Sequence, residues 1–186
     1  MKKVVVIGGG GIGSWLLSIL RYYFERNQLK DMELYIMDPD KVERKNLQYS
    51  KFTEEDIGKY KAEVLGKRYK FDYVVAKLTD QSQLKDYDLI VLAVDNSEAR
   101  DIVYKSDKFW IDCRSKGMEY SVFFKSARTK NNTLNLKRAP ESCQYNQRLK
   151  LGYVDCGNVI AAAIGVAQIL NYFRGTLSVS EVIGVL

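Results

Sequence analysis

Apolar and polar positions follow one another along the chain in blocks that predict alternating strands and helices. Residues 4–7 are a run of β-branched residues typical of a buried strand, and the apolar residues that follow recur at helical spacing. Predicted helices cover residues 12–25, 61–69, 97–104 and 157–173, and predicted strands cover residues 4–7, 33–37, 73–78, 88–94 and 109–112. This order predicts an α/β fold with a doubly wound, mostly parallel, Rossmann-like sheet and helices on both faces.

The pattern changes in the C-terminal third of the chain. Residues 118–124 and 133–136 are β-like segments around a polar turn at 129–132, which predicts a hairpin or an antiparallel extension of the sheet. The helix at 157–173 is apolar almost all round, so it has to be buried, either under the sheet or across a dimer interface. We expect the tail from 176 to 186 to be a docked strand or a helical turn. A chain of 186 residues suits one domain, so residues 1–186 are predicted to form a single unit.

The first predicted strand runs directly into a glycine-rich loop. Gly8, Gly9, Gly10, Gly11 and Gly13 lie between this strand and the first helix. Glycines let the backbone turn sharply and approach a phosphate, while the N-terminus of a helix offers free N–H groups and partial positive charge. The loop therefore predicts a nucleotide site. It does not identify the nucleotide, because dehydrogenases, flavoproteins and adenylating enzymes share it.

Carboxylates follow two of the predicted strands. Asp38 and Asp40 flank Pro39 after the second strand, where this fold hydrogen-bonds the ribose hydroxyls of an adenine nucleotide, so Asp38 is predicted to bind the ribose. A solvated turn beside proline is the alternative for Asp38. Asp95 follows the strand at 88–94. A carboxylate that faces a triphosphate needs a cation between them, which predicts a Mg²⁺ ligand, and Asp95 could also cap the next helix.

Composition narrows the chemistry that the chain can perform. The absence of histidine removes serine–histidine and cysteine–histidine catalysis and most transition-metal sites. The three cysteines lack C-x-x-C spacing, which argues against a disulfide framework or a structural zinc site. A net charge of +6 fits an acidic partner or a polyphosphate, but the basic residues are spread along the chain without a recognition motif, which argues against nucleic acid.

The hydropathy of the chain also bears on its location. No apolar run approaches the length that spans a bilayer, and the first strand begins too early to leave room for a signal peptide. We therefore expect a cytoplasmic protein without a membrane segment.

A long polar segment separates the second strand from the helix at 61–69, where an ordinary dinucleotide-binding domain has a short loop. This segment and its flanks carry a series of short motifs in a fixed order. They are the glycine loop, Asp38-Pro39-Asp40, Val42-Glu43 with Asn46-Leu47, Asp56-Ile57-Gly58 with Lys61-Ala62, and Asp95-Asn96 with Arg100. The series resembles the ThiF, MoeB and E1 family, whose members use ATP to adenylate the C-terminal carboxylate of ubiquitin-like and sulfur-carrier proteins.

The resemblance implies cofactors, partners and residue roles. ATP and Mg²⁺ would be the cofactors, and a small ubiquitin-like or sulfur-carrier protein would be the partner. Lys61 and Asn46 would contact the phosphates that lie over the glycine loop, and Asp95 would hold the cation. Members of the family associate as dimers, so we expect a homodimer. Cys143 is the candidate nucleophile for a later thioester step, with a small buried thiol as the alternative.

One position departs from the family pattern. Where the motif carries an arginine over the ATP phosphates, this chain has Tyr49. A phenol cannot neutralise phosphate charge, and loss of such a cation commonly costs several kcal/mol of transition-state stabilisation. Two alternatives therefore stay open. The first is a catalytically weak or inactive ATP-binding relative that acts as a binding module. The second is an NAD(P)-dependent oxidoreductase that uses the glycine loop and Asp38.

Overall fold

The computed structural model describes residues 1–125, 144, 149–150, 152–176 and 181–185. Within these residues one seven-stranded sheet has the order β3-β2-β1-β4-β5-β6-β7. The strands are β1 (Lys2–Ile7), β2 (Met32–Met37), β3 (Asp72–Val74), β4 (Leu89–Leu92), β5 (Phe109–Lys116), β6 (Glu119–Phe124) and β7 (Glu181–Val185). The pairs from β3 to β5 are parallel, and the pairs β5–β6 and β6–β7 are antiparallel. The predicted fold class is confirmed.

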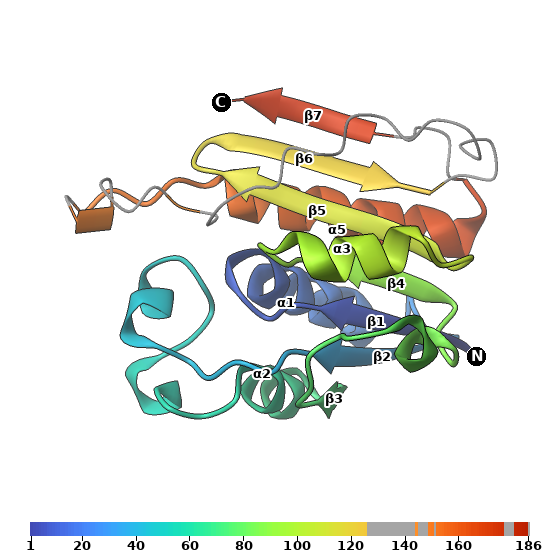
Figure 1. Ribbon diagram of the computed structural model, residues 1–186, viewed down its shortest axis with the longest axis horizontal. Coiled ribbons are helices and arrows are strands. Elements are labelled where there is room, and N and C mark those ends of the chain that lie inside the picture. Colours follow the sequence, from blue (N-terminus) through green and yellow to red (C-terminus); the bar gives the residue numbers. More distant parts are fainter. Residues whose placement is uncertain (126–143, 145–148, 151, 177–180, 186) are drawn as a thin grey trace.

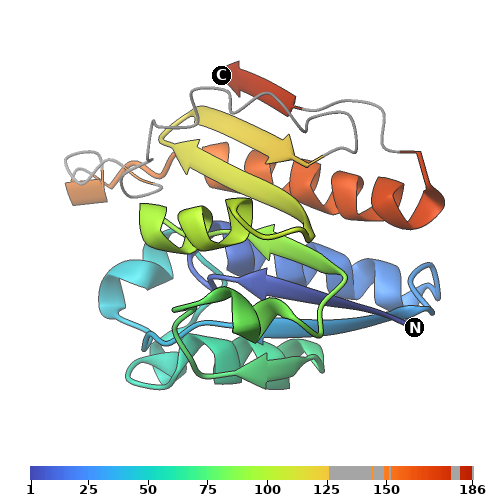
Figure 2. The ribbon, with the colours of Figure 1, turned by 45° about the vertical axis from the view of Figure 1, so that its right-hand side comes forward.

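Helices cover both faces of the sheet. On one face lie α1 (Gly11–Glu25), α2 (Lys61–Tyr69) and α5 (Gly157–Arg174), and on the other lies α3 (Ser97–Tyr104). Figure 1 shows α3 in front of the sheet and α5 behind it, and Figure 2 shows the strands stacked from β3 at the bottom to β7 at the top. Side chains of β1 alternate between the layers: Val4 and Val6 pack with the first set of helices, whereas Val5 and Ile7 pack on the side of α3. All four are buried, as expected of a central parallel strand.

Helix boundaries agree with the predictions more closely than strand boundaries do. Helices α2 and α3 have the predicted bounds, but the strand predicted at 73–78 ends at Val74 and the one predicted at 88–94 covers only Leu89–Leu92. After Val74 the chain leaves the sheet and crosses to the face of α3. There Leu78 is buried and Lys77 forms an ion pair with Glu98 of α3. Leu78 is therefore buried in this crossing and is not part of the strand.

The antiparallel extension is built from β5, β6 and β7. Strands β5 and β6 form a hairpin that turns at Gly117, and β7 pairs with the other edge of β6. The predicted partner strand at 133–136 and its turn at 129–132 lie outside the described residues. The prediction of a docked strand in the tail is confirmed, because β7 lies within it.

Helix α5 is buried under the sheet, which is the first of the two alternatives that its sequence left open. It packs against β5, β6 and α1. The contact is close, because a Cβ added at Gly165 would lie 2.6 Å from Cys113 Sγ, and one added at Gly157 would overlap the carbonyl oxygen of Gly117. Among the described residues, no helix is long and apolar enough to cross a membrane.

Candidate functional site

The glycine loop joins β1 to α1 at the carboxyl edge of the sheet. Gly8 has φ +99°, and an added Cβ there would lie 2.6 Å from the carbonyl oxygen of Ala93, while a Cβ at Gly13 would overlap the carbonyl oxygen of Gly8. The fold itself therefore requires these two glycines. Gly10 is different, because an added Cβ would meet no atom within 4 Å. No side-chain hydrogen bond caps this end of α1 among the described residues. The space beside Gly10 and the uncapped helix terminus together fit a phosphate group.

Asp38 lies beside this loop at the end of β2. Its Oδ2 accepts a hydrogen bond of 2.6 Å from the Gly9 N–H, and its Oδ1 accepts one of 2.8 Å from the Asp40 N–H. The residue is only 5% exposed. Burial raises the pKa of the Asp38 carboxyl above its ordinary value, while Lys61 and the two backbone hydrogen bonds oppose that rise. Each oxygen keeps a further acceptor position, so the carboxylate can accept bonds from ribose hydroxyls.

Lys61 is fixed at the same edge by Asp40. Its Nζ lies 3.1 Å from Asp40 Oδ2, and its backbone N–H donates to the Asp40 carbonyl oxygen at 2.9 Å. The Lys61 side chain is 11% exposed, whereas that of Asp40 is 65% exposed. Lys61 also lowers the pKa of Asp38 by its charge, so the cation is close to the predicted ribose carboxylate. The structure thus brings together the glycine loop, Asp38, Asp40 and Lys61.

The polar segment between β2 and α2 is a closed excursion at the left-hand side of Figure 1. Lys41 and Tyr60 form a bridge at its base, and it contains the short helices η1 (Arg44–Gln48) and η2 (Glu54–Asp56). Phe52 is buried in the core, which anchors the middle of the segment. Its neighbour Lys51 has its carbonyl oxygen bonded by Arg68 of α2, and Arg68 also pairs with Asp56 at 2.6 Å. The excursion is therefore tied to the domain at several points along its length.

Asn46 and Tyr49 are linked within this excursion. Asn46 Oδ1 accepts from the Glu43 N–H at 2.9 Å, and Asn46 Nδ2 donates to the Tyr49 hydroxyl at 3.1 Å. Asn46 is only 4% exposed. A Cβ added at Gly11 would lie 3.1 Å from the Tyr49 ring, so this ring lies over the first turn of α1. The amide oxygen of Asn46 is thus occupied within the excursion, and Asn46 is connected to the glycine loop through Tyr49.

Asn158 is a part of this site that the sequence analysis missed. Its Nδ2 donates to the Tyr49 carbonyl oxygen at 2.9 Å and to the Gly11 carbonyl oxygen at 3.3 Å, and the Tyr49 oxygen also accepts from Trp15 Nε1. Asn158 is 1% exposed on α5. A polar side chain in the first turn of a mainly apolar helix was the available signal, but its partners are more than a hundred residues away in sequence.

Asp95 lies at the same edge of the sheet, just before α3. Ile7 of β1 is paired with Leu92 of β4, so Gly10 and Asp95 follow neighbouring strand ends. Asp95 is exposed. The residue that caps α3 is Asn96, whose Oδ1 accepts from the Ala99 N–H at 3.0 Å, so the suggestion that Asp95 caps this helix is wrong. Within the described residues, no group of His, Cys, Asp and Glu is arranged to hold a metal by itself.

The cysteines differ in environment. Cys143, the predicted nucleophile, lies outside the described residues. Cys113 is buried on β5, and burial raises the pKa of its thiol, so it is an unreactive packing residue. Cys156 is exposed at the N-terminal end of α5.

The sequence matches a known family over nearly its whole length. The profile of the ThiF family covers residues 1–178. The chain belongs to the ThiF family. Solved structures of E. coli MccB, an E1-like adenylating enzyme, share the fold of this ThiF-family chain. MccB with ATP is 18% identical with a TM-score of 0.68, and the match covers 94% of this chain and 56% of that chain. MccB with AMPCPP and MccA gives the same values.

A structure of PaaA is 17% identical with a TM-score of 0.67, and it covers all of this chain and 61% of PaaA. At these identities the likeness establishes the fold. The chain spans 56% of the MccB–ATP chain and 61% of the PaaA chain. No curated protein matches the sequence significantly.

Proposed function

We propose that this ThiF-family chain binds ATP with Mg²⁺ and adenylates the C-terminal carboxylate of a small protein or peptide. The observation that carries the proposal is the open space at Gly10, flanked by a buried carboxylate on Asp38 and a nearly buried cation on Lys61. This arrangement fits an adenine nucleotide whose ribose lies on Asp38 and whose phosphates lie along the N-terminus of α1. MccB, which shares the fold, has been solved with ATP and with AMPCPP and MccA.

Different residues would contact the phosphates and the Mg²⁺ ion. Gly8 to Gly13 would supply backbone N–H groups to the phosphates, and Lys61 would supply positive charge. Asp95 would share Mg²⁺ with phosphate oxygens and water, which is the usual arrangement for this ion at a nucleotide. Asn46 would contribute indirectly, by holding Tyr49 and the segment between β2 and α2 in place beside the phosphates. Bound Mg²⁺ would neutralise charge on the triphosphate.

The reaction itself needs little proton chemistry. An oxygen of the substrate carboxylate attacks the α-phosphorus of ATP, a P–O bond forms to give the acyl-adenylate, and pyrophosphate leaves with the electrons of the broken P–O bond. The nucleophile is already ionised, so no general base is required. Positioning and charge neutralisation suffice, which suits a chain without histidine.

The substrate would be a small ubiquitin-like or sulfur-carrier protein, or a shorter peptide with a free C-terminus. The net charge of +6 favours an acidic partner. A homodimer stays a prediction, which light scattering would test. A thioester step at Cys143 also stays a prediction, which mass spectrometry of the trapped adduct would test.

Carboxylate-dependent exchange of labelled pyrophosphate into ATP tests the proposal. The assay would use the purified chain with small β-grasp proteins encoded near it and with their isolated C-terminal peptides. We expect exchange that depends on a free C-terminal carboxylate and that falls at least about a hundredfold in Lys61→Met. An amidated C-terminus is the matched control. Background exchange with every candidate would overturn adenylation as the function.

Tyr49 favours a second candidate function, an ATP-binding module that has lost the chemistry. The ring lies over the first turn of α1, where the family places an arginine, and it is held there by Asn46 and Asn158. ATP binding without exchange, in both the wild type and Tyr49→Arg, would support the module. Exchange that appears only in Tyr49→Arg would show a catalytic site lacking one cation.

A further inference from the structure

A buried arginine donates hydrogen bonds to the backbone of the loop that carries Asp95. Arg100 lies on α3 and is only 3% exposed. Its Nη1 donates to the Asn96 carbonyl oxygen at 3.1 Å, and its Nη2 donates to the carbonyl oxygen of Val94. These two carbonyl groups belong to the residues on either side of Asp95, so one guanidinium fixes the backbone on both sides of the carboxylate.

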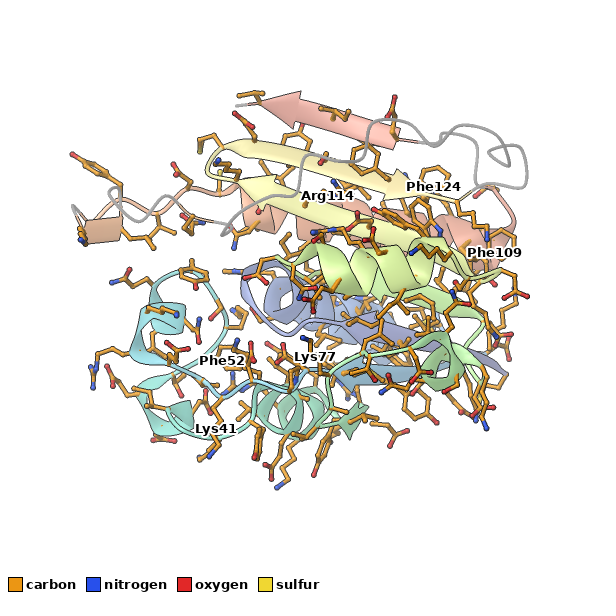
Figure 3. The ribbon with its side chains drawn as sticks, viewed as in Figure 1. Lys41, Phe52, Lys77, Phe109, Arg114 and Phe124 are labelled. Carbon is orange, nitrogen blue, oxygen red and sulfur yellow. The ribbon has the colours of Figure 1, made fainter. Side chains whose placement is uncertain are left out.

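The arginine is itself anchored on the neighbouring strand. Arg100 Nε lies 3.1 Å and 3.2 Å from the two oxygens of Asp112, which is fully buried on β5. The Asp112 carboxylate also accepts from Arg114 Nε at 2.7 Å and from the Tyr104 hydroxyl. Figure 3 labels Arg114 on β5, next to α3. The side chains that hold Arg100 therefore come from β5 and α3 and not from the loop that carries Asp95.

Two side chains around Asp112, Arg114 and Tyr104, keep their protons at neutral pH. Burial opposes the charge of Arg114, but Asp112 and Tyr104 together raise its pKa above the ordinary value. Burial, followed by the charge of Asp112, raises the pKa of the Tyr104 phenol, which therefore stays a neutral donor. Neither Arg114 nor Tyr104 therefore changes its protonation near neutral pH.

We propose that Arg100 is a positioning residue for the nucleotide site, and that its two bonds to the backbone around Asp95 hold that carboxylate in place for the Mg²⁺ of bound ATP. The inference rests on the proposed function. Asp95 is exposed, and its carboxylate forms no hydrogen bond or ion pair with the described residues, so its position depends on the backbone. Asn96 contributes at the other end of the loop by capping α3. A ligand held in advance binds a cation more tightly than one that has to be ordered on binding.

Lysine cannot replace Arg100 in this role. The guanidinium is planar and donates in several fixed directions, here toward Asp112, Val94 and Asn96 at once. An ammonium group of similar charge could keep the ion pair with Asp112, but it could not also reach both carbonyl groups in the same geometry.

The test is the Mg²⁺ concentration at which ATP binding is half-maximal, measured by titration of ATP over a range of Mg²⁺ at a temperature where every variant is folded by circular dichroism. Arg100→Lys is compared with Tyr104→Phe. Tyr104→Phe removes a hydrogen bond to Asp112 but leaves the bonds of Arg100 to the loop around Asp95, whereas Arg100→Lys removes those bonds to the loop. Asp95→Asn is the reference for loss of the ligand.

We expect the Mg²⁺ midpoint to rise about tenfold in Arg100→Lys and to stay within about twofold of wild type in Tyr104→Phe. Equal midpoints in wild type and Arg100→Lys, with a raised midpoint in Asp95→Asn, would overturn the positioning role while leaving the proposed function standing. No binding of ATP by the wild type would overturn both. No change in Asp95→Asn would show that Asp95 does not hold the Mg²⁺, and this result would overturn the positioning role of Arg100.

A second pair of variants tests the same idea without touching the buried cluster. Asn96→Ser and Asn96→Ala both remove the amide, but serine can still cap α3 whereas alanine cannot. We expect the Mg²⁺ midpoint to be higher in Asn96→Ala than in Asn96→Ser. Equal midpoints in these two variants would show that order in this loop does not matter, and this result would overturn the proposal even if Arg100→Lys failed to fold.

Discussion

At the scale of single residues, the glycines of the glycine loop serve different purposes. Gly8 adopts φ +99° and approaches the backbone of Ala93, and Gly13 leaves room for the carbonyl oxygen of Gly8. Both are needed for β1, α1 and β4 to pack. Gly10 is not in contact with anything that a methyl group would displace. Packing of the protein therefore does not explain its lack of a side chain, whereas the nucleotide that we propose at this loop would explain it.

Gly10→Ala should separate binding from stability. The substitution adds a methyl group in open space at φ −75°, so we expect the free energy of unfolding to fall by about 1 kcal/mol or less. The same methyl group would lie where the phosphates approach, so ATP affinity should fall at least about tenfold. Denaturant unfolding and calorimetric titration measure the two quantities. Gly13→Ala is the contrasting variant, because its methyl group would overlap backbone and should destabilise the fold. Unchanged ATP affinity in Gly10→Ala would place the phosphates elsewhere.

Asp38 gives the site a dependence on pH. Burial raises the pKa of this carboxyl, so on acidification it takes up its proton at a higher pH than an ordinary aspartate does. Protonation removes an acceptor from a group that already accepts from the N–H groups of Gly9 and Asp40. ATP affinity should therefore weaken as pH falls from 7 toward about 5, and the decline should be shallower in Asp38→Asn. The comparison cancels the ionisation of ATP itself. Parallel profiles for the two proteins would exclude Asp38 from nucleotide binding.

At the scale of elements, the apolar and polar pattern of the sequence predicted the helix boundaries that depend on neighbouring residues. Helices α2 and α3 begin and end where the sequence predicts, because their apolar spacing and flanking polar residues are read within a few positions. The strand at 73–78 was predicted too long because Leu78, an apolar residue typical of a strand, is buried on the α3 side after the chain has left β3. The contacts of Asn158 and the pair of Arg100 with Asp112 could not be predicted, since no local pattern connects these residues and only the fold brings them together.

The contact between α5 and β5 offers a test of packing at this scale. Alanine usually stabilises the interior of a helix relative to glycine by roughly 1 kcal/mol. At Gly165 the added Cβ would lie 2.6 Å from Cys113 Sγ, so we expect Gly165→Ala to destabilise the protein by about 1–2 kcal/mol instead. In a Cys113→Ala background the overlap disappears, and the same substitution should be neutral or stabilising. Denaturant unfolding of the four proteins gives the coupling energy. Additive effects would mean that α5 does not pack on β5 in this way.

At the scale of the whole molecule, the sheet order explains why the candidate residues meet. Strands β1, β2 and β4 are neighbours and parallel, so the glycine loop, Asp38 and Asp95 leave the sheet at one edge. Their sequence positions predicted this meeting because the order of alternating strands and helices predicts a parallel sheet. The antiparallel strand β7 and its pairing with β6 were not predicted in detail, since a short tail carries little periodic signal.

The most direct test of the account is a calorimetric comparison of ATP with Mg²⁺ and of NADH as ligands for the wild type and for Asp95→Ala. We predict saturable binding of ATP with Mg²⁺, an affinity at least about tenfold weaker in Asp95→Ala, and no binding of NADH. Binding of NADH without ATP would contradict the account and favour an oxidoreductase. Binding of neither ligand would mean that this ThiF-family fold, with Tyr49 over its phosphate loop, has no nucleotide site.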